Sequence, residues 1–244
     1  MLTVNAASGF GSGGAAGRAD IGDAPQTNLV SHFRADLGIT IATGVSTWED
    51  QVGNNDFTQA TTSRQPIYSA TSGANGLDGV EFEAGANPDW MNAAGIVLSQ
   101  PYHVFVVGMH KEFSTDGIPF WTGLDPSTTQ LQHAASTPDL KLAAGIGGNH
   151  CVNGDATIGE FSLIESFLSG ASSHITVNNG TAATGNPGSL GLPNGVRLTT
   201  GGGITFGSNI NSVISEMLFY DTAEVTGSTL TALYTYLNSQ YDLF

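Results

Sequence analysis

Positive charge is scarce in this sequence. Six of its 244 residues are Lys or Arg, against 21 Asp or Glu, so the formal net charge is -15. The six cations are scattered singly and form no basic patch. Nucleic acids and anionic membrane surfaces attract clustered Lys and Arg and repel an acidic surface. We therefore expect neither nucleic acid nor a membrane among the partners of this protein.

Cysteine and long apolar runs are also missing. Cys151 is the single cysteine, so no internal disulfide can form and stability must come from packing. The chain has no apolar run of roughly 18 residues, and no transmembrane helix is expected. Residues 1–5 lack the charged and apolar regions of a secretory signal. Either the protein stays in the compartment where it is made or a signal has been removed, and Met1 favours the first.

Glycine and neutral polar residues take the place of charge. Charged residues make up 11% of the chain, where about 25% is usual, and glycine occupies 33 positions. From about residue 28 onward, short apolar runs alternate with Gly, Pro and Asn clusters, a rhythm typical of all-β proteins. The sequence predicts a two-sheet antiparallel sandwich. Its clearest strands are predicted over residues 80–83, 102–109, 173–177, 203–207 and 212–220.

Three local patterns refine this fold. Residues 102–109 are nearly all apolar, which predicts a central strand covered on both faces. Residues 178–180 read Asn-Asn-Gly, the signal of a type I′ hairpin turn. A stripe with helical spacing predicts a short C-terminal helix that packs on the sandwich near Phe219. The stripe consists of Leu230, Leu233, Tyr234, Leu237 and Tyr241.

The first 26 residues differ in composition from the rest. They are rich in Gly, Ala and Ser, and they contain too few large apolar side chains to offset the entropy lost on ordering. We predict an N-terminal arm over residues 1–26 and a single domain over 27–244. The arm is either a disordered tail or a segment that becomes ordered on a partner, in which case it should contact its own domain little. Its anchors would be Leu2, Val4, Phe10 and Ile21.

Patterns that carry catalysis are absent. The E-x-D-x-x-E strand of β-glucan hydrolases and the G-x-S-x-G elbow of serine hydrolases do not occur in a usable setting. Glu81 and Glu83 lie two residues apart on a predicted strand, and solvated carboxylates are the ordinary explanation for such a pair. We expect a protein that is not an enzyme.

No cofactor is expected either. The histidines lack the spacing of zinc ligands, and the loop acids lack the D-x-D-x-D-G array of a calcium loop. One structural calcium ion is the alternative left open. Its candidate ligands are Asp116, Asp125, Asp139 and Asp155.

Aromatic residues offer the remaining binding chemistry. Trp48 precedes a polar turn and is interpreted as a core residue. Trp90 and Trp121 lie near turn residues, where they would either fill the sandwich or stack against a sugar. Glu216 lies in the apolar strand 212–220, and we expect it to avoid the face of Ile214 and Leu218. It would then face solvent or satisfy backbone groups of a neighbouring loop.

A series of short motifs resembles laminin-G-like, concanavalin A-like jelly-roll domains. The resemblance spans roughly residues 28–244, and the order of the motifs supports it as much as their content. The N-terminal half has counterparts of three motifs of this family: the W-x-D-x-S-G-N-x-N-x-A stretch, the Q-P-x-Y segment and the F-D-G strand. The C-terminal end has a counterpart of the family's G-x-I-x-E-x-x-Y-D ending. The matching segments are residues 29–36, 48–55, 57–59, 64–68, 75–82, 204–207, 214–221 and the terminal helix.

Such domains, preceded by a Gly-rich arm, resemble structural proteins of tailed bacteriophages. The resemblance implies a non-enzymatic virion protein, a capsid decoration, head fibre or tail-associated component. It would be made in the host cytoplasm and displayed on the virion surface, attached to other virion proteins through the arm, and oligomeric in the assembly. Its displayed domain could adhere to host polysaccharide. The alternative is a lectin-like, carbohydrate-binding module that is not tied to a virion.

Overall fold

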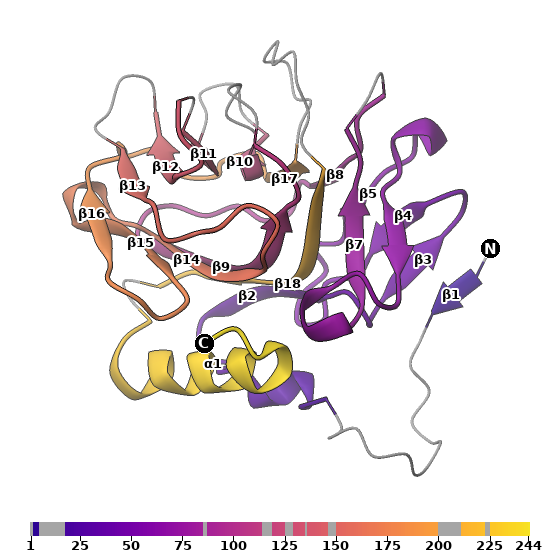
Figure 1. The fold of residues 1–244 in the computed structure, drawn as a ribbon, viewed down its shortest axis with the longest axis horizontal. Helices are drawn as coiled ribbons and strands as arrows, with labels where there is room; N and C mark the ends of the chain where they lie inside the picture. Colours follow the sequence, from indigo (N-terminus) through magenta and orange to yellow (C-terminus); the bar gives the residue numbers. More distant parts are fainter. Residues whose placement is uncertain are drawn as a thin grey trace.

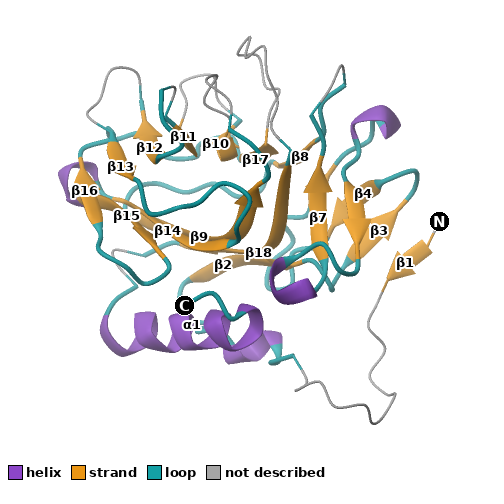
Figure 2. Ribbon diagram, viewed as in Figure 1, coloured by secondary structure: helices purple, strands orange, loops and turns teal. Residues whose placement is uncertain are grey.

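The computed structural model describes residues 2–4, 18–84, 87–113, 119–124, 129–134, 136–145, 150–199, 211–222 and 225–244. Two antiparallel sheets face each other, and a helix covers the outer face of one of them (Figures 1 and 2). This is the predicted jelly-roll sandwich with a C-terminal helix. Within the described part, no helix is long and apolar enough to cross a membrane.

The strands divide into two layers, which we call sheet A and sheet B. Sheet A runs in the order β1 (Leu2–Val4), β3 (Ile39–Ile41), β4 (Val45–Trp48), β5 (Phe57–Thr58), β8 (Trp90–Ala93), β17 (Val196–Thr199), β10 (Pro119–Gly123), β11 (Thr129–His133), β12 (Leu140–Ala144) and β13 (Cys151–Asn153). Sheet B runs in the order β16 (Ala183–Gly185), β15 (Ser173–Val177), β14 (Ser162–Leu168), β9 (Tyr102–His110), β18 (Ser212–Tyr220), β7 (Gly79–Phe82) and β6 (Ile67–Ser69), with β2 (Leu29–Arg34) also paired to β18. The helices are η1 (Ile21–Asp23), η2 (Thr62–Arg64), η3 (Ala74–Gly76), η4 (Gly170–Ser172) and α1 (Gly227–Tyr241).

The strand β9 has an apolar neighbour on each of its faces, as predicted. Val104 and Val106 point into the core between the two sheets. Phe105 and Val107 point the other way, into a second core beneath α1. Because side chains alternate along a strand, an unbroken apolar run is stable only where both faces are covered.

The helix α1 closes that second core. Leu233 and Leu237 are fully buried there with Leu218 of β18, so the predicted helical stripe is confirmed. The predicted contact with Phe219 is wrong. Phe219 points into the core between the sheets, where its ring packs edge-on against Phe33.

The turn at residues 178–180 is also confirmed. Asn178 and Asn179 have φ angles of 48° and 55°, and the Gly180 N–H donates to the Val177 carbonyl at 2.8 Å. These are the two positive φ angles that a type I′ turn needs. The predicted strand 203–207 lies outside the described residues.

The N-terminal segment contacts its own domain more than we predicted. Residues 18–26 pack on the domain: Ala24 is buried in the core beneath α1, and a capping box between Asp20 and Asp23 fixes η1. Ile21 is half-buried. Residues 18–26 therefore lie against the sandwich rather than extending away from it.

Farther toward the N-terminus, the backbone of residues 2–4 forms β1, which pairs antiparallel with β3 of the same chain. Leu2 and Val4 lie in this strand, whereas Phe10 lies outside the described residues. The expectation of few contacts with the chain's own domain is therefore not met. Ordering of residues 1–17 on a partner stays a prediction.

Candidate functional site

The outer face of sheet A carries a row of polar side chains across five strands. Backbone pairing places Thr58, Asn92, Arg197, Thr122 and Gln130 side by side on β5, β8, β17, β10 and β11. Their neighbours along the strands point into the core, so this row points outward. The predicted neutral, hydrogen-bonding surface is found on this face.

Trp90 stands beside this row, in a cluster with Arg197 and Asn92. The guanidinium carbon of Arg197 lies 4.5 Å from the centroid of the Trp90 ring, and Arg197 Nε donates to Asn92 Oδ1 at 2.7 Å. All three side chains are half-buried. Burial lowers the pKa of Arg197 from its usual value. The stack and the hydrogen bond hold the guanidinium and the indole in one arrangement before any ligand arrives.

A hollow of about 470 Å³ is lined by residues that include Asp89, the residue before Trp90 in the chain. Its lining includes the exposed Thr62 and Ser63 of η2, together with Glu83 and Asp89. Asp89 Oδ2 accepts the Glu83 N–H at 2.9 Å. Burial, together with the negative charge of Glu83, raises the pKa of Asp89 to about 6, against the lowering effect of that hydrogen bond.

The cations divide into two groups. Arg18, Arg34 and Lys111 form ion pairs with carboxylates. The other three, within the described ranges, have no carboxylate partner, and all three lie on sheet A or its border. Arg197 and Lys141 point outward from β17 and β12, and Arg64 of η2 donates to the Pro88 carbonyl, two residues before Trp90.

The two tryptophans proposed for sugar stacking have different positions. Trp90 is on the outer face, where a ligand can reach it. Trp121 is fully buried between Leu131 and Leu198 in the core, so its role in stacking is excluded. Trp48 is a core residue, as interpreted, and its indole N–H donates to the Arg34 carbonyl at 3.1 Å.

The remaining sequence candidates do not come together as a site. Asp116 and Asp125 lie outside the described residues. Asp139 accepts a hydrogen bond from Thr137, and Asp155 is exposed. Among the residues that the structure describes, no three His, Cys, Asp or Glu side chains could hold a metal ion together. Glu81 is paired with Lys111 at 2.5 Å.

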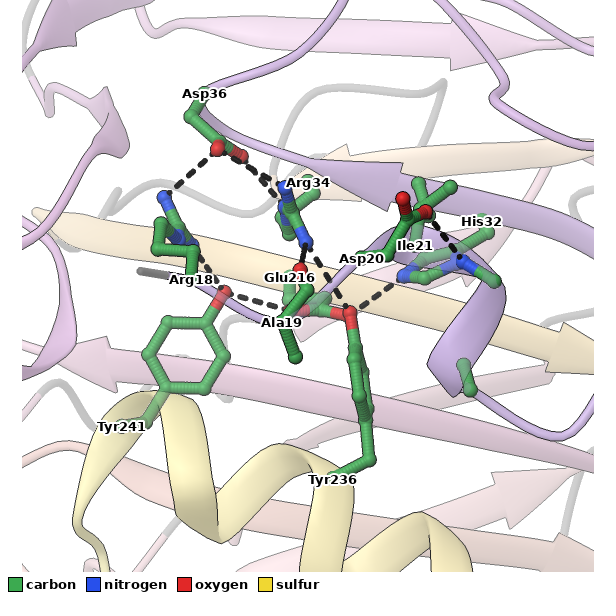
Figure 3. A network of polar contacts seen from close by, with 12 residues as sticks. Arg18, Ala19, Asp20, Ile21, His32, Arg34, Asp36, Glu216, Tyr236 and Tyr241 are labelled. Carbon is green, nitrogen blue, oxygen red and sulfur yellow. Dashed lines mark hydrogen bonds and ion pairs between the residues drawn. The ribbon is translucent and has the colours of Figure 1, made fainter. Parts of the chain in front are cut away.

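Sequence reasoning missed a buried network centred on Glu216 (Figure 3). Its carboxylate accepts hydrogen bonds from His32 Nε2 at 2.6 Å, Tyr236 Oη at 2.9 Å and Tyr241 Oη at 2.7 Å. Arg34 lies within 3.5 Å of Tyr236 Oη. Burial alone would raise the pKa of Glu216, but the hydrogen bond from His32 and its electrostatic interaction with the carboxylate, with Tyr241 and Arg34, hold the pKa below its usual value.

The prediction for Glu216 is wrong in both of its alternatives. Leu218 lies two residues away and shares its face, and a bulge between Ile214 and Glu216 turns Ile214 into the core between the sheets. Glu216 therefore points at α1 and is fully buried. The signal that could have found it is an acidic residue in an apolar strand followed by a tyrosine-bearing helix, since a buried carboxylate needs donors.

This network also binds the N-terminal segment. Arg18 lies 3.2 Å from both Asp36 and Asp78, and it donates to Tyr241 Oη at 2.9 Å. Arg34 donates to the Ala19 carbonyl at 2.8 Å. The network links residues near both ends of the described domain to the outer face of sheet B.

A second buried carboxylate secures the middle of α1. Glu165 of β14 accepts from Tyr234 Oη at 2.6 Å and lies 3.3 Å from His103 Nδ1. His103 Nε2 accepts the Val225 N–H at 2.9 Å, which assigns the ring proton to Nδ1, the nitrogen nearer to Glu165. Burial opposes ionisation, but His103, His174 and Tyr234 together lower the pKa of Glu165 to about 2.

Comparison with known proteins supports the fold. No family model and no curated protein matches the sequence. A sialidase from Trypanosoma rangeli, in complex with 2,3-difluorosialic acid, matches 88% of this chain with a TM-score of 0.59 and 13% identity. This chain spans about a third of that sialidase's length, 34%.

Two further solved structures come from an arabinanase and an arabinofuranosidase. Domain 4 of AbnA, a GH43 extracellular arabinanase from Geobacillus stearothermophilus solved with arabinotriose, aligns with 86% of this chain and 100% of its own, at a TM-score of 0.55 and 16% identity. An arabinofuranosidase complexed with arabinofuranosyl-α-1,2-xylobiose aligns over 81% of this chain and 51% of its own, at 0.53 and 16%. At these identities the likeness establishes a shared β-sandwich fold.

Proposed function

We propose that this chain is a glycan-binding module that presents the outer face of sheet A to its ligand. The observation that carries the proposal is the cluster of Trp90, Arg197 and Asn92. It combines an aromatic ring, a guanidinium and an amide, held in place by one another on an accessible strand surface. No catalytic step is part of this proposal.

The chemistry of the face suits a sugar. A pyranose or furanose ring has apolar C–H faces and a rim of hydroxyls, so it needs an aromatic surface and several neutral donors and acceptors. The accessible part of the row, from Thr58 to Thr122, supplies those groups. Side chains fixed before binding lose little entropy on complex formation.

The comparisons support this proposal without testing it. The solved domain that aligns over its full length was solved with an arabino-oligosaccharide. The other two structures also carry sugar-derived ligands by their names. The shared fold is thus one on which sugar binding occurs, whereas the residues that bind must be judged from this chain.

The proposal is tested by screening the full chain on a glycan array and measuring the hits by calorimetry. Trp90→Ala should abolish the signal or weaken it about tenfold or more, because an aromatic contact would be lost. Phe244→Ala is the matched control, since Phe244 is an exposed aromatic outside sheet A. Equal binding by Trp90→Ala and the wild type would show that the sugar binds elsewhere or not at all.

The virion role implied by the sequence resemblance is a second proposal. What favours it is β1, because a segment that adds to the edge strand β3 of its own chain has the backbone geometry to add to the edge of another protein. Purified protein should bind empty virus particles, and a variant lacking residues 1–17 should not. If both proteins bound equally well, the arm would not be needed for attachment.

A further inference from the structure

We propose that the sugar recognised by sheet A is acidic, a glycan unit whose carboxylate is bound by the guanidinium of Arg197. This inference rests on the proposed glycan-binding function and names the class of its ligand. The molecule as a whole is strongly acidic, whereas the outer face of sheet A carries the cations Arg197 and Lys141.

Arg197 has unused hydrogen-bonding capacity. Its Nε donates to Asn92, and in the described part of the chain its two terminal nitrogens have no acceptor. Stacking on Trp90 fixes the plane of the guanidinium. A planar guanidinium with free terminal N–H groups matches the two oxygens of a carboxylate in a bidentate pair.

Within the described ranges no carboxylate pairs with Arg197, although the chain has 21 acidic residues. Arg18 and Arg34 are each held by one or two aspartates. Glu83 and Asp89, which precede Trp90 closely in the chain, form no ion pair with Arg197. In so acidic a chain, a half-buried arginine that no described acidic side chain pairs with is best explained by an acid that comes with the ligand.

Lys141 extends the argument along the sheet. It points outward from β12, three strands from Arg197, and no carboxylate in the described ranges pairs with it. Three strand spacings of about 4.8 Å and an offset of two residues along the strands separate the backbones of the two cations by roughly 16 Å. Burial lowers the pKa of Lys141, so an anion beside it would compensate for its lost hydration. A glycan with spaced acidic units would meet both cations.

The overall charge of -15 limits how acidic the ligand can be. Repulsion from distant carboxylates is screened beyond roughly 8–10 Å in physiological salt, whereas the contact with Arg197 is local. A sugar with isolated carboxylates is therefore favoured over a densely charged polyanion such as nucleic acid.

Two pairs of matched ligands test the inference by calorimetry. The first is sialyllactose against lactose, and the second is a galacturonic acid trisaccharide against its methyl ester. The wild type should bind the acid of at least one pair about tenfold more tightly than the neutral partner. Arg197→Gln should bring that ratio within about twofold of unity, because the acid loses its guanidinium partner while the neutral sugar has none to lose.

Lys111→Gln is the matched control, because it removes the same charge from a residue paired with Glu81 on another part of the surface. It should keep the preference for the acid. Equal affinity of the wild type for acid and neutral sugar would overturn the acidic ligand and leave the glycan-binding proposal standing. Binding of no sugar, acidic or neutral, on these probes and on the array would overturn both proposals.

Discussion

Replacing Glu216 with Gln should strongly destabilise the protein. The carboxylate accepts from His32, Tyr236 and Tyr241, and each of these groups points a proton at it. The amide of Gln has almost the same shape, but it offers one acceptor oxygen and an NH₂ group that donates. Donors would then face donors in a site that is sealed from water.

The size of the effect follows from the burial of this group. Glu216 is fully buried, so no solvent can replace a lost partner. A buried donor left without its acceptor costs about 1–3 kcal/mol, and disruption of a buried charged network costs about 3–5 kcal/mol. For a domain of this length, 1 kcal/mol shifts the melting temperature by about 2–4 °C, so we expect a fall of roughly 6–20 °C.

Differential scanning calorimetry at neutral pH measures this fall directly. Glu160→Gln is the control, because Glu160 is exposed and the same change of charge should leave its melting temperature almost unaltered. Hydrogen exchange should show the largest loss of protection in α1, since Tyr236 and Tyr241 belong to it. A Glu216→Gln protein that melts within about 2 °C of the wild type would refute the claim that this network fastens the helix.

Three further predictions follow from the same packing. Val106→Asp should prevent folding, because it buries an unpaired charge between the sheets, and a soluble variant with native circular dichroism would contradict this. Removal of residues 228–244 should expose Phe105, Leu218 and Tyr220 and cause aggregation, visible by light scattering; an unchanged melting temperature would show that α1 is dispensable. Glu165 has a pKa of about 2 in the folded state, so its contribution to the free energy of unfolding should be complete above about pH 4.5. That contribution should fall progressively toward pH 2, because the unfolded state takes up the proton first. Glu165→Gln, though less stable, should show a shallower dependence over that range.

The sequence predicted well those elements whose secondary structure is determined by a local pattern of residues. An apolar run of eight or nine residues is either a strand covered on both faces or a buried helix. The β-branched residues of β9 favour the strand, so this element was recognisable from the sequence. The Asn-Asn-Gly turn depends on φ angles that few other residues tolerate. The helical stripe of α1 needs nothing beyond its own spacing.

The candidate site depended on register, which the sequence does not encode locally. Trp90 and Trp121 have similar neighbours in the chain, yet one points outward and the other inward because strand pairing sets their faces. A shift of one residue reverses the face of a side chain. The bulge beside Ser215 had this effect on Ile214 and Glu216. The partners of Glu216 also come from residues up to 184 positions away, a distance at which no spacing rule applies.

The position of β18 in sheet B determines when the domain can fold during synthesis. This strand lies between β9 and β7 and also pairs with β2, so segments from early, middle and late parts of the chain meet on it. The ribosome must therefore have made residues 212–220 before sheet B can close, and residues 236–241 before Glu216 finds its donors. Until then the apolar strand β9 lacks a partner on that edge, and contacts of such long sequence separation form slowly. The nascent chain therefore exposes β9 to aggregation while residues 111–220 are made, and a chaperone would act by shielding residues 102–110 during that interval.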